Sequence, residues 1–177
     1  MDWKAIITGT WDTEMSQQLV DEMLRDESLF HEVFEAFYNG DSQQIAHRSG
    51  HLLGRVFKKS PEWLYPRIEI LFEKMNTPPC PTFRWYVLYY MSHTAYDQKH
   101  DGPTANYAFQ ELDNRGNKPG VKNTCMRLLE KICRRTPEFN TEFKLYLEEL
   151  IVYERRSLVC KAKSQIKLLQ KWERIQE

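Results

Sequence analysis

The chain has 177 residues, of which 41% are apolar and 28% are charged, and this is enough material for one soluble domain with a sizeable core. The formal charge is zero, and no stretch approaches the roughly 18 apolar residues that a membrane span requires, which argues against a membrane-spanning protein. The N-terminal sequence MDWKAIITGTWD has neither the basic nor the apolar region of a signal peptide, so we expect a cytoplasmic protein with reduced thiols.

The charges are distributed unevenly along the chain. Residues 1–40 carry two Lys or Arg against nine Asp or Glu, whereas residues 101–177 carry fifteen against eleven. An acidic front and a basic rear weakly favour a basic binding surface. Ordinary solvated helix faces are the alternative interpretation.

Helical periodicity runs through almost the whole chain, and no segment shows the sustained alternation of a strand. We expect residues 1–27 to form one or two acidic capping helices. After them, apolar residues recur at helical spacing at Phe30, Phe34 and Phe37. The segments 60–62 and 136–138 each read Ser or Thr, Pro, Glu, which is typical of a helix N-terminus.

One pattern occurs twice, 76 positions apart. IAHRSGHLLGRVFKKSPEWL occupies 45–64, and VKNTCMRLLEKICRRTPEFN occupies 121–140. A related segment, FRWYVLYYMSHTAY, begins at the midpoint, so that Leu53, Met91 and Leu129 align. A fourth, less regular unit begins near residue 159. A period near 38 residues with two helices per period predicts stacked helical hairpins, because one hairpin cannot bury its apolar stripe alone.

These segments resemble HEAT and related armadillo-like repeats, in which the inner helix opens on an apolar–basic pair and closes on Leu-Gly and an aliphatic residue. QQIAHRSGHLLGRV at 43–56 and PGVKNTCMRLLEKI at 119–132 fit this description, and Phe83-Arg84 supplies the pair between them. The chain departs from the pattern at Ala46 and in the bulky aromatic residues of 83–96. The resemblance implies a single all-α domain over 1–177, a right-handed α-α superhelix of stacked hairpins with its repeats over 28–175.

In such repeats the second helix of each pair lines a concave groove. The positions that should face this groove are basic or His in the first unit, aromatic or His in the second, and mainly basic in the third. We predict that these residues bind the partner: His47, His51, Arg55, Lys58, Trp85, Tyr89, His93, Tyr96, Asn123, Arg127, Lys131 and Arg134. An aromatic strip between basic strips suits an anionic partner with flat or apolar groups. The alternative is that Trp85 and Tyr89 belong to the core.

No set of residues specifies a reaction, and we expect no cofactor or metal. His47 and His51 have a spacing that can hold zinc, but no third ligand follows at a typical spacing, and no C-x-x-C, Walker or G-x-S-x-G motif is present. Some bacterial DNA glycosylases are built from HEAT-like repeats, and by that analogy Trp85 with Arg84 or Arg48 would be the candidate parts. The catalytic acid of those enzymes has no counterpart in the groove, since the nearest acids, at 97 and 101, follow the aromatic helix.

We therefore predict a non-enzymatic scaffold that binds a protein or peptide, acidic in character, along the concave groove, with no membrane partner. Nucleic-acid binding, with or without excision of alkylated bases, is the alternative function.

Overall fold

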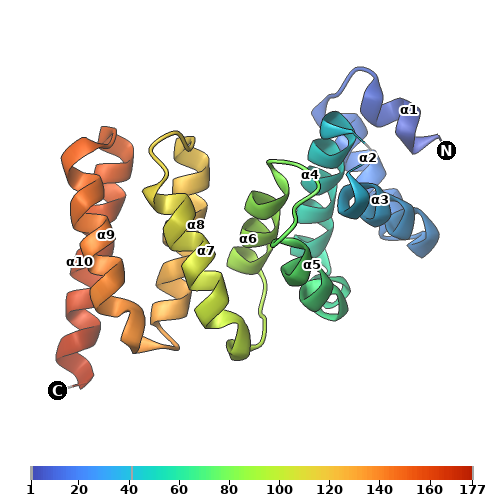
Figure 1. The fold of residues 1–177 in the computed structure, drawn as a ribbon. Coiled ribbons are helices and arrows are strands. Elements are labelled where there is room, and N and C mark those ends of the chain that lie inside the picture. The colour runs from blue at the N-terminus through green and yellow to red at the C-terminus, as the bar shows by residue number, and fades with distance from the viewer. Residues whose placement is uncertain (1, 41, 177) are drawn as a thin grey trace. The chain divides into compact units, whose positions relative to one another are not determined.

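The computed structural model describes residues 2–40 and 42–176, with side chains through Arg174. All of the regular structure in these residues is helical, which confirms the prediction of an all-α fold of paired helices. No helix in the described part is long and apolar enough to cross a membrane. The helices in chain order (Figure 1) are α1 (Trp3–Thr8), α2 (Thr13–Met23), α3 (Glu27–Asn39), α4 (Gln43–Lys59), α5 (Ile68–Lys74), α6 (Phe83–His93), α7 (Asp101–Asp113), α8 (Pro119–Cys133), α9 (Asn140–Tyr153) and α10 (Arg156–Gln176).

The chain divides into two compact units, Met1–Tyr96 and Asp97–Glu177, called unit 1 and unit 2 below. Two helices, α1 and α2, lie within the predicted capping segment at 1–27. Their role as caps, and the single domain over 1–177, stay predictions.

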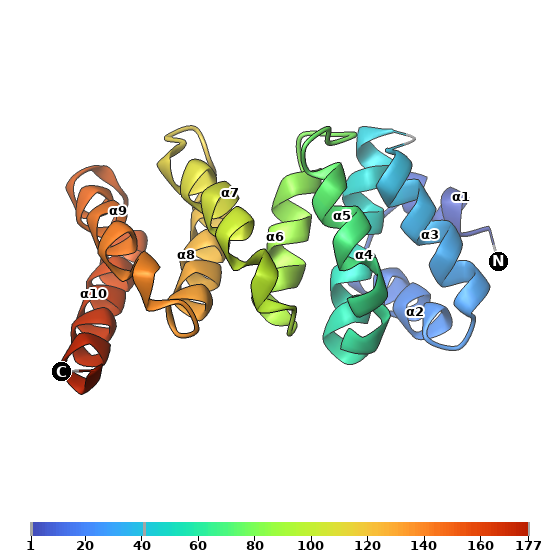
Figure 2. The same cartoon turned by 60° about the horizontal axis from the view of Figure 1, so that its bottom comes forward.

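Unit 1 is organised around α4. This helix packs against α3, its partner in the hairpin, and against α2 and α6 on its two sides (Figure 2). The apolar side of α3 supplies Phe30 and Phe37, whose rings contact Phe57 of α4 and Phe83 of α6 at centroid distances of 6.0 and 4.7 Å. The core of unit 1 is therefore a cluster of aromatic rings enclosed by α3, α4 and α6.

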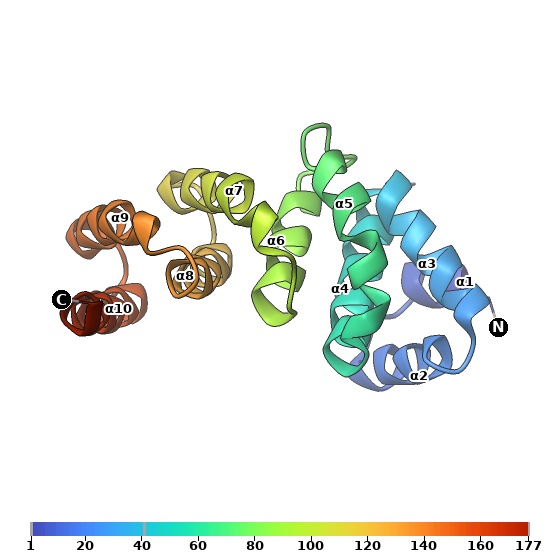
Figure 3. The same cartoon turned by 90° about the horizontal axis from the view of Figure 1, so that it is seen from below.

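Unit 2 has the same construction in two helix layers. Figure 3 shows α7 and α9 together on one side of this unit and α8 and α10 on the other. Lys122 of α8 is fully buried, and its ammonium bonds to the Glu154 carboxylate at the turn between α9 and α10 and lies 5.2 Å from the ring centroid of Tyr153. A buried ion pair thus ties the second hairpin of unit 2 to the first.

The predicted period is visible as hydrogen bonds between neighbouring second helices. Lys59 bonds to Asp21 of α2 at 2.8 Å, Tyr90 to the carbonyl of Gly50 at 2.7 Å, and Gln165 to the carbonyl of Met126 at 3.0 Å. These pairs are 38, 40 and 39 positions apart in sequence. The three residues aligned by the repeat, Leu53, Met91 and Leu129, are all buried, so the register derived from the sequence describes the packing inside each unit.

Two glycines allow α6 to pack closely on α4. A Cβ atom placed on Gly50 would lie 2.6 Å from Cδ2 of Tyr86, and one on Gly54 would lie 2.9 Å from Cε1 of Tyr89. Because real Cβ atoms do not approach other carbons this closely, only glycine fits under these rings. The bulky aromatic residues of α6 are therefore matched by the absence of side chains on α4.

The two Ser/Thr-Pro-Glu segments differ from the prediction. Each forms a short 3₁₀ turn, Pro61–Trp63 or Pro137–Phe139, and in neither does the preceding hydroxyl cap a backbone amide. The hydroxyl of Thr136 donates instead to the buried carboxylate of Asp101 at 3.0 Å, and the following helix, α9, begins only at Asn140. At Thr136 the helix start expected from the sequence is not formed, because a tertiary acceptor competes for the hydroxyl.

Replacement of Gly50 by Ala should destabilise unit 1. Alanine gains about 1 kcal/mol of helix propensity over glycine, but the contact with Tyr86 leaves no room, and overpacking costs about 1–3 kcal/mol. The matched control is Gly120→Ala in α8, where a Cβ atom meets nothing within 4 Å and should be neutral or mildly stabilising. Urea denaturation of both variants gives the two free energies of unfolding, and a Gly50→Ala protein as stable as Gly120→Ala would contradict the close approach.

Candidate functional site

Charge is separated between the two helix layers of each unit. In unit 1 the second helices α4 and α6 carry five Lys or Arg and no Asp or Glu, whereas the first helices α3 and α5 carry one Lys and five Glu. In unit 2 the second helices α8 and α10 carry nine Lys or Arg against two Glu, and α7 and α9 carry one Lys against six Asp or Glu. The layer of second helices is thus basic in each unit, as an anion-binding surface requires.

Six of the predicted residues form one surface of unit 1, which we call the α4–α6 patch: His47, His51, Lys58, Trp85, Tyr89 and His93. The three from α4 are exposed, and the three from α6 are partly exposed. Tyr89 is the centre of the patch, because the Lys58 ammonium lies 4.9 Å from its ring centroid and the rings of Trp85 and His93 lie 5.6 and 4.4 Å away. The patch therefore combines flat apolar area with a cation.

The loop between α1 and α2 borders the patch, although the sequence analysis did not place it there. The guanidinium of Arg48 lies 5.3 Å from the ring centroid of Trp11 and donates to the carbonyl of Gly9 at 2.9 Å and to that of Ile7. The ring of Trp11 in turn meets His51 edge-on at 6.2 Å. The signal that could have identified this loop is Trp11, an aromatic residue that stands outside the helical periodicity.

His51 has its pKa lowered by its surroundings. Partial burial is the main cause, followed by the positive charges of Arg55, His47 and Lys58. His51 is nevertheless an exposed residue, so it can contact a partner. A carboxylate placed beside it would oppose these effects and favour the imidazolium form.

Two predicted residues of unit 1 do not face solvent as expected. Tyr96 is only 8% exposed, because α6 ends at His93, the backbone becomes extended at Thr94, and Tyr96 no longer lies at helical spacing from Tyr89. Arg55 is half-buried, and its guanidinium bonds to the hydroxyl of Ser16 at 2.6 Å and to the side chain of Gln17. It is used to dock α2 on α4.

Of the four predicted residues of unit 2, three lie on α8, and Arg134 directly follows its last residue. Arg134 pairs with Glu130 at 2.8 Å and lies 5.2 Å from the ring centroid of Trp172. Asn123 accepts a hydrogen bond from Lys161 of α10. Arg127 is exposed and Lys131 is half-buried, so α8 and α10 are joined by part of the predicted set.

The acids considered for base excision have structural partners. Asp101 is 2% exposed and pairs with Arg135 at the end of α8, and Asp97 caps the amide of Lys99 at 3.0 Å. Within residues 2–40 and 42–176, no group of three or more His, Cys, Asp or Glu is placed to hold a metal ion.

Comparison with known proteins identifies one family. A family model described as a HEAT repeat domain matches residues 3–167, which is nearly the whole chain. No curated protein and no solved structure matches the chain.

The ammonium of Lys131 should have an unusually low pKa. Burial and the nearby charge of Arg135 lower its pKa to about 8, against the opposing effect of Asp101. Reductive methylation with ¹³C-labelled formaldehyde, followed by NMR titration, measures each lysine separately, and Lys131→Arg identifies the resonance. We expect a midpoint near pH 8 for Lys131, and a midpoint above about 10, the ordinary lysine range, would contradict this environment.

Proposed function

The chain belongs to the HEAT repeat domain family, and from that premise we propose that it is a scaffold whose α4–α6 patch binds an acidic peptide segment of a protein partner. HEAT repeats are helical scaffolds that often mediate protein interactions. The observation that carries the proposal is the contact between Lys58 of α4 and Tyr89 of α6. Neither helix contains an Asp or Glu. A peptide that presents a carboxylate beside an apolar or aromatic side chain complements both groups.

The charges within the patch favour a peptide over nucleic acid. Arg48 and Arg55 also lie on α4, but the first is held by backbone carbonyls and the second by the side chains of α2. Lys58 is thus the cation that the patch presents alongside its histidines. Binding to duplex DNA usually needs several phosphate contacts, each adding about 0.9 to the slope of log affinity against log salt.

The face of α8 is a second candidate contact region within unit 2. Arg127 is exposed there, and α8 and α10 are strongly basic. The proposal depends on the patch alone, because there a lysine and two further aromatic rings gather around Tyr89.

Replacement of Lys58 by Gln should weaken binding of an acidic peptide. Fluorescence anisotropy measures the affinity of the parent protein and of Lys58→Gln for a labelled peptide in which Glu and Phe alternate. A second peptide, in which every Glu is replaced by Gln, is measured in the same way. We expect a loss of about fivefold in affinity, the usual size of an exposed charge pair, and weak binding of the Gln analogue.

The structure provides a matched control at Lys74. Its ammonium lies 4.9 Å from the ring centroid of Tyr38, the same distance as between Lys58 and Tyr89, but outside the patch. Lys74→Gln should leave the affinity unchanged. Equal losses of peptide affinity in the two variants would refute the α4–α6 patch as the binding site. Micromolar binding of duplex DNA with a steep salt dependence would show that the ligand is nucleic acid and not a peptide.

Affinity for the acidic peptide should rise as the pH falls from about 7.5 to about 5.5. The pKa of His51 is lowered in the free protein, and a bound carboxylate raises it, so binding takes up a proton and is favoured at lower pH. The same titration with His51→Asn should be flatter. An affinity that is constant or decreases over this range would show that no carboxylate lies beside His51.

A further inference from the structure

The hairpin formed by α9 and α10 has one side that is not covered by another helix. Among the described residues of unit 2, α10 packs against α9 and α8, and the side of the hairpin that points away from α7 and α8 is open (Figure 3). On α10, Lys161 and Gln165 bond to α8. Val159 and Ile166 are seven positions apart and, by helical spacing, lie on the other side of α10.

Helix α9 contributes to the same open side. Its Tyr146 stacks on Phe109 of α7 at a centroid distance of 4.8 Å, and helical spacing places Ile151 on the side of α9 away from this contact. Three partly exposed aliphatic residues thus lie on the open side, and exposed charged residues border them. We call this surface the α9–α10 face: Ile151, Val159 and Ile166, bordered by Glu148, Lys163 and Lys167.

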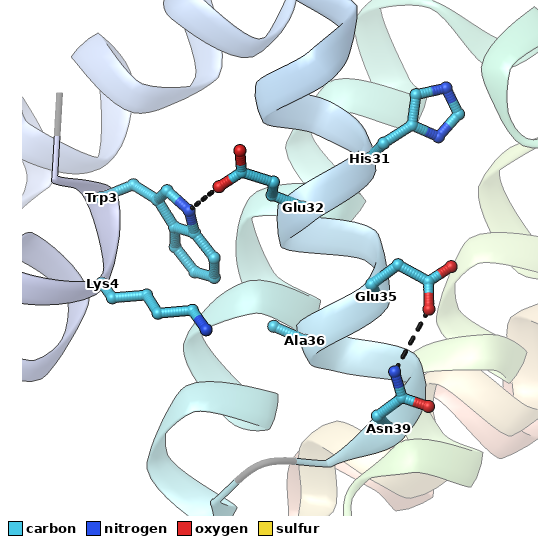
Figure 4. Close-up of a pocket in the computed structure, with 7 residues that line it drawn as sticks. All are labelled: Trp3, Lys4, His31, Glu32, Glu35, Ala36 and Asn39. Atoms are coloured by element: carbon cyan, nitrogen blue, oxygen red, sulfur yellow. Dashed lines mark hydrogen bonds between the residues drawn. The ribbon is translucent and has the colours of Figure 1, made fainter.

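The outward side of α3 in unit 1 shows what a solvated helix surface looks like in this protein. It carries Glu32, Glu35 and Asn39, and the Glu35 carboxylate accepts a hydrogen bond from the Asn39 amide at 3.1 Å (Figure 4). Helix α1 covers part of it, since the indole of Trp3 donates to Glu32 at 2.8 Å. A stack of helical repeats needs such a polar outer surface to remain soluble. The aliphatic α9–α10 face departs from this rule, as expected of a contact surface.

The charges of the α9–α10 face are complementary to those of a second copy. Helix α9 carries three Glu and one Lys, whereas α10 carries six Lys or Arg and one Glu. Lys163 lies four positions after Val159 and borders the face on α10, and Glu148 lies three positions before Ile151 and borders it on α9. A twofold axis parallel to the helices places α10 of each copy on α9 of the other. Each basic margin then meets an acidic one.

We propose that the protein forms a twofold dimer in which the α9–α10 face binds the same face of a second copy. Helix α9 has 14 residues and α10 has 21. At about 1.5 Å per residue and about 10 Å per helix width, the two helices present about 500 Å². The dimer therefore buries about 1,000 Å² in total, which is near the lower limit for a specific interface, and its dissociation constant should be on the order of 10–100 μM.

A head-to-tail contact is the other arrangement that the charges permit, with α10 of one copy on the acidic helices α2 and α3 of the next. It is disfavoured because the aliphatic residues of the α9–α10 face would meet the polar outward side of α3. Such a contact does not close and would continue from copy to copy. The α9–α10 face lies in unit 2 and the α4–α6 patch in unit 1, so the dimer and the proposed peptide binding can fail separately.

Sedimentation equilibrium of the full chain between about 2 and about 500 μM tests the dimer. The average mass should rise from 21.3 kDa towards twice that value and level off there. Ile166→Glu should keep the protein monomeric, whereas Ile70→Glu, the same change at a residue of α5 that is 40% exposed, should leave the dimer unchanged. A constant monomer mass, growth beyond the dimer, or equal effects of the two substitutions would overturn the proposal.

A charge exchange tests how the two copies are paired and does not alter the aliphatic residues. Lys163→Glu/Lys167→Glu and Glu148→Lys change only exposed side chains, and each variant alone should weaken the dimer, the first by about fivefold or more. An equimolar mixture of the two variants should dimerise about as well as the parent protein, because every α10–α9 contact in the mixed dimer again joins opposite charges. Circular dichroism verifies that both variants are folded. A mixture no stronger than the separate variants would refute the pairing of α10 with α9.

Discussion

The contact between the bare backbone of α4 and the tyrosine rings of α6 is the constraint on which unit 1 depends. Gly50 and Gly54 leave a strip of helix without side chains, and the rings of Tyr86, Tyr89 and Tyr90 pack over it. The hydroxyl of Tyr90 reaches the carbonyl of Gly50 and is fully buried there, so the contact is fixed by a hydrogen bond as well as by shape. Tyr86 and Tyr90 are buried at this interface, whereas Trp85, Tyr89 and His93 on the neighbouring face of α6 remain partly exposed. Tyr89 thus covers Gly54 and also belongs to the α4–α6 patch.

The separation of charge between layers gives each unit two chemically different sides. First helices are acidic and second helices are basic, in both unit 1 and unit 2. The separation is not complete, because α2 carries three acids and no Lys or Arg although it packs against α4, where its Asp21 pairs with Lys59. The formal charge of zero therefore conceals an uneven distribution of charged residues between the helix layers of each unit.

Much of the fold was predictable because it depends on a period. The alignment of Leu53, Met91 and Leu129 needs only the spacing of apolar residues, and the same spacing located the helix faces to which His47, Lys58 and Tyr89 belong. The predictions that failed were those that depended on tertiary contacts or on where a helix ends. Tyr96 was misplaced because helical spacing was extended past the end of α6, and Arg55 because its neighbour on α2 could not be identified from sequence alone.

The contact between α1 and α3 was not predictable for a related reason. Trp3 and Glu32 are 29 positions apart and lie on helices that share no repeat register, so no motif connects them. The short helix α1 looked like a cap of polar character, and nothing in its sequence showed that its tryptophan would turn toward α3. Contacts between the repeats and a terminal helix cannot be found from the period, because the terminal helix does not follow it.

The buried Lys122–Glu154 pair has a consequence for how unit 2 assembles. An ammonium that is fully enclosed by protein is costly unless its counter-ion is present, and here the counter-ion comes from the next hairpin. If the second hairpin docked one helical turn out of place, the apolar stripes would still meet, but the charge would be left alone in the interior. The ion pair thus favours the native register of the two hairpins and disfavours shifted registers that hydrophobic contacts alone would allow.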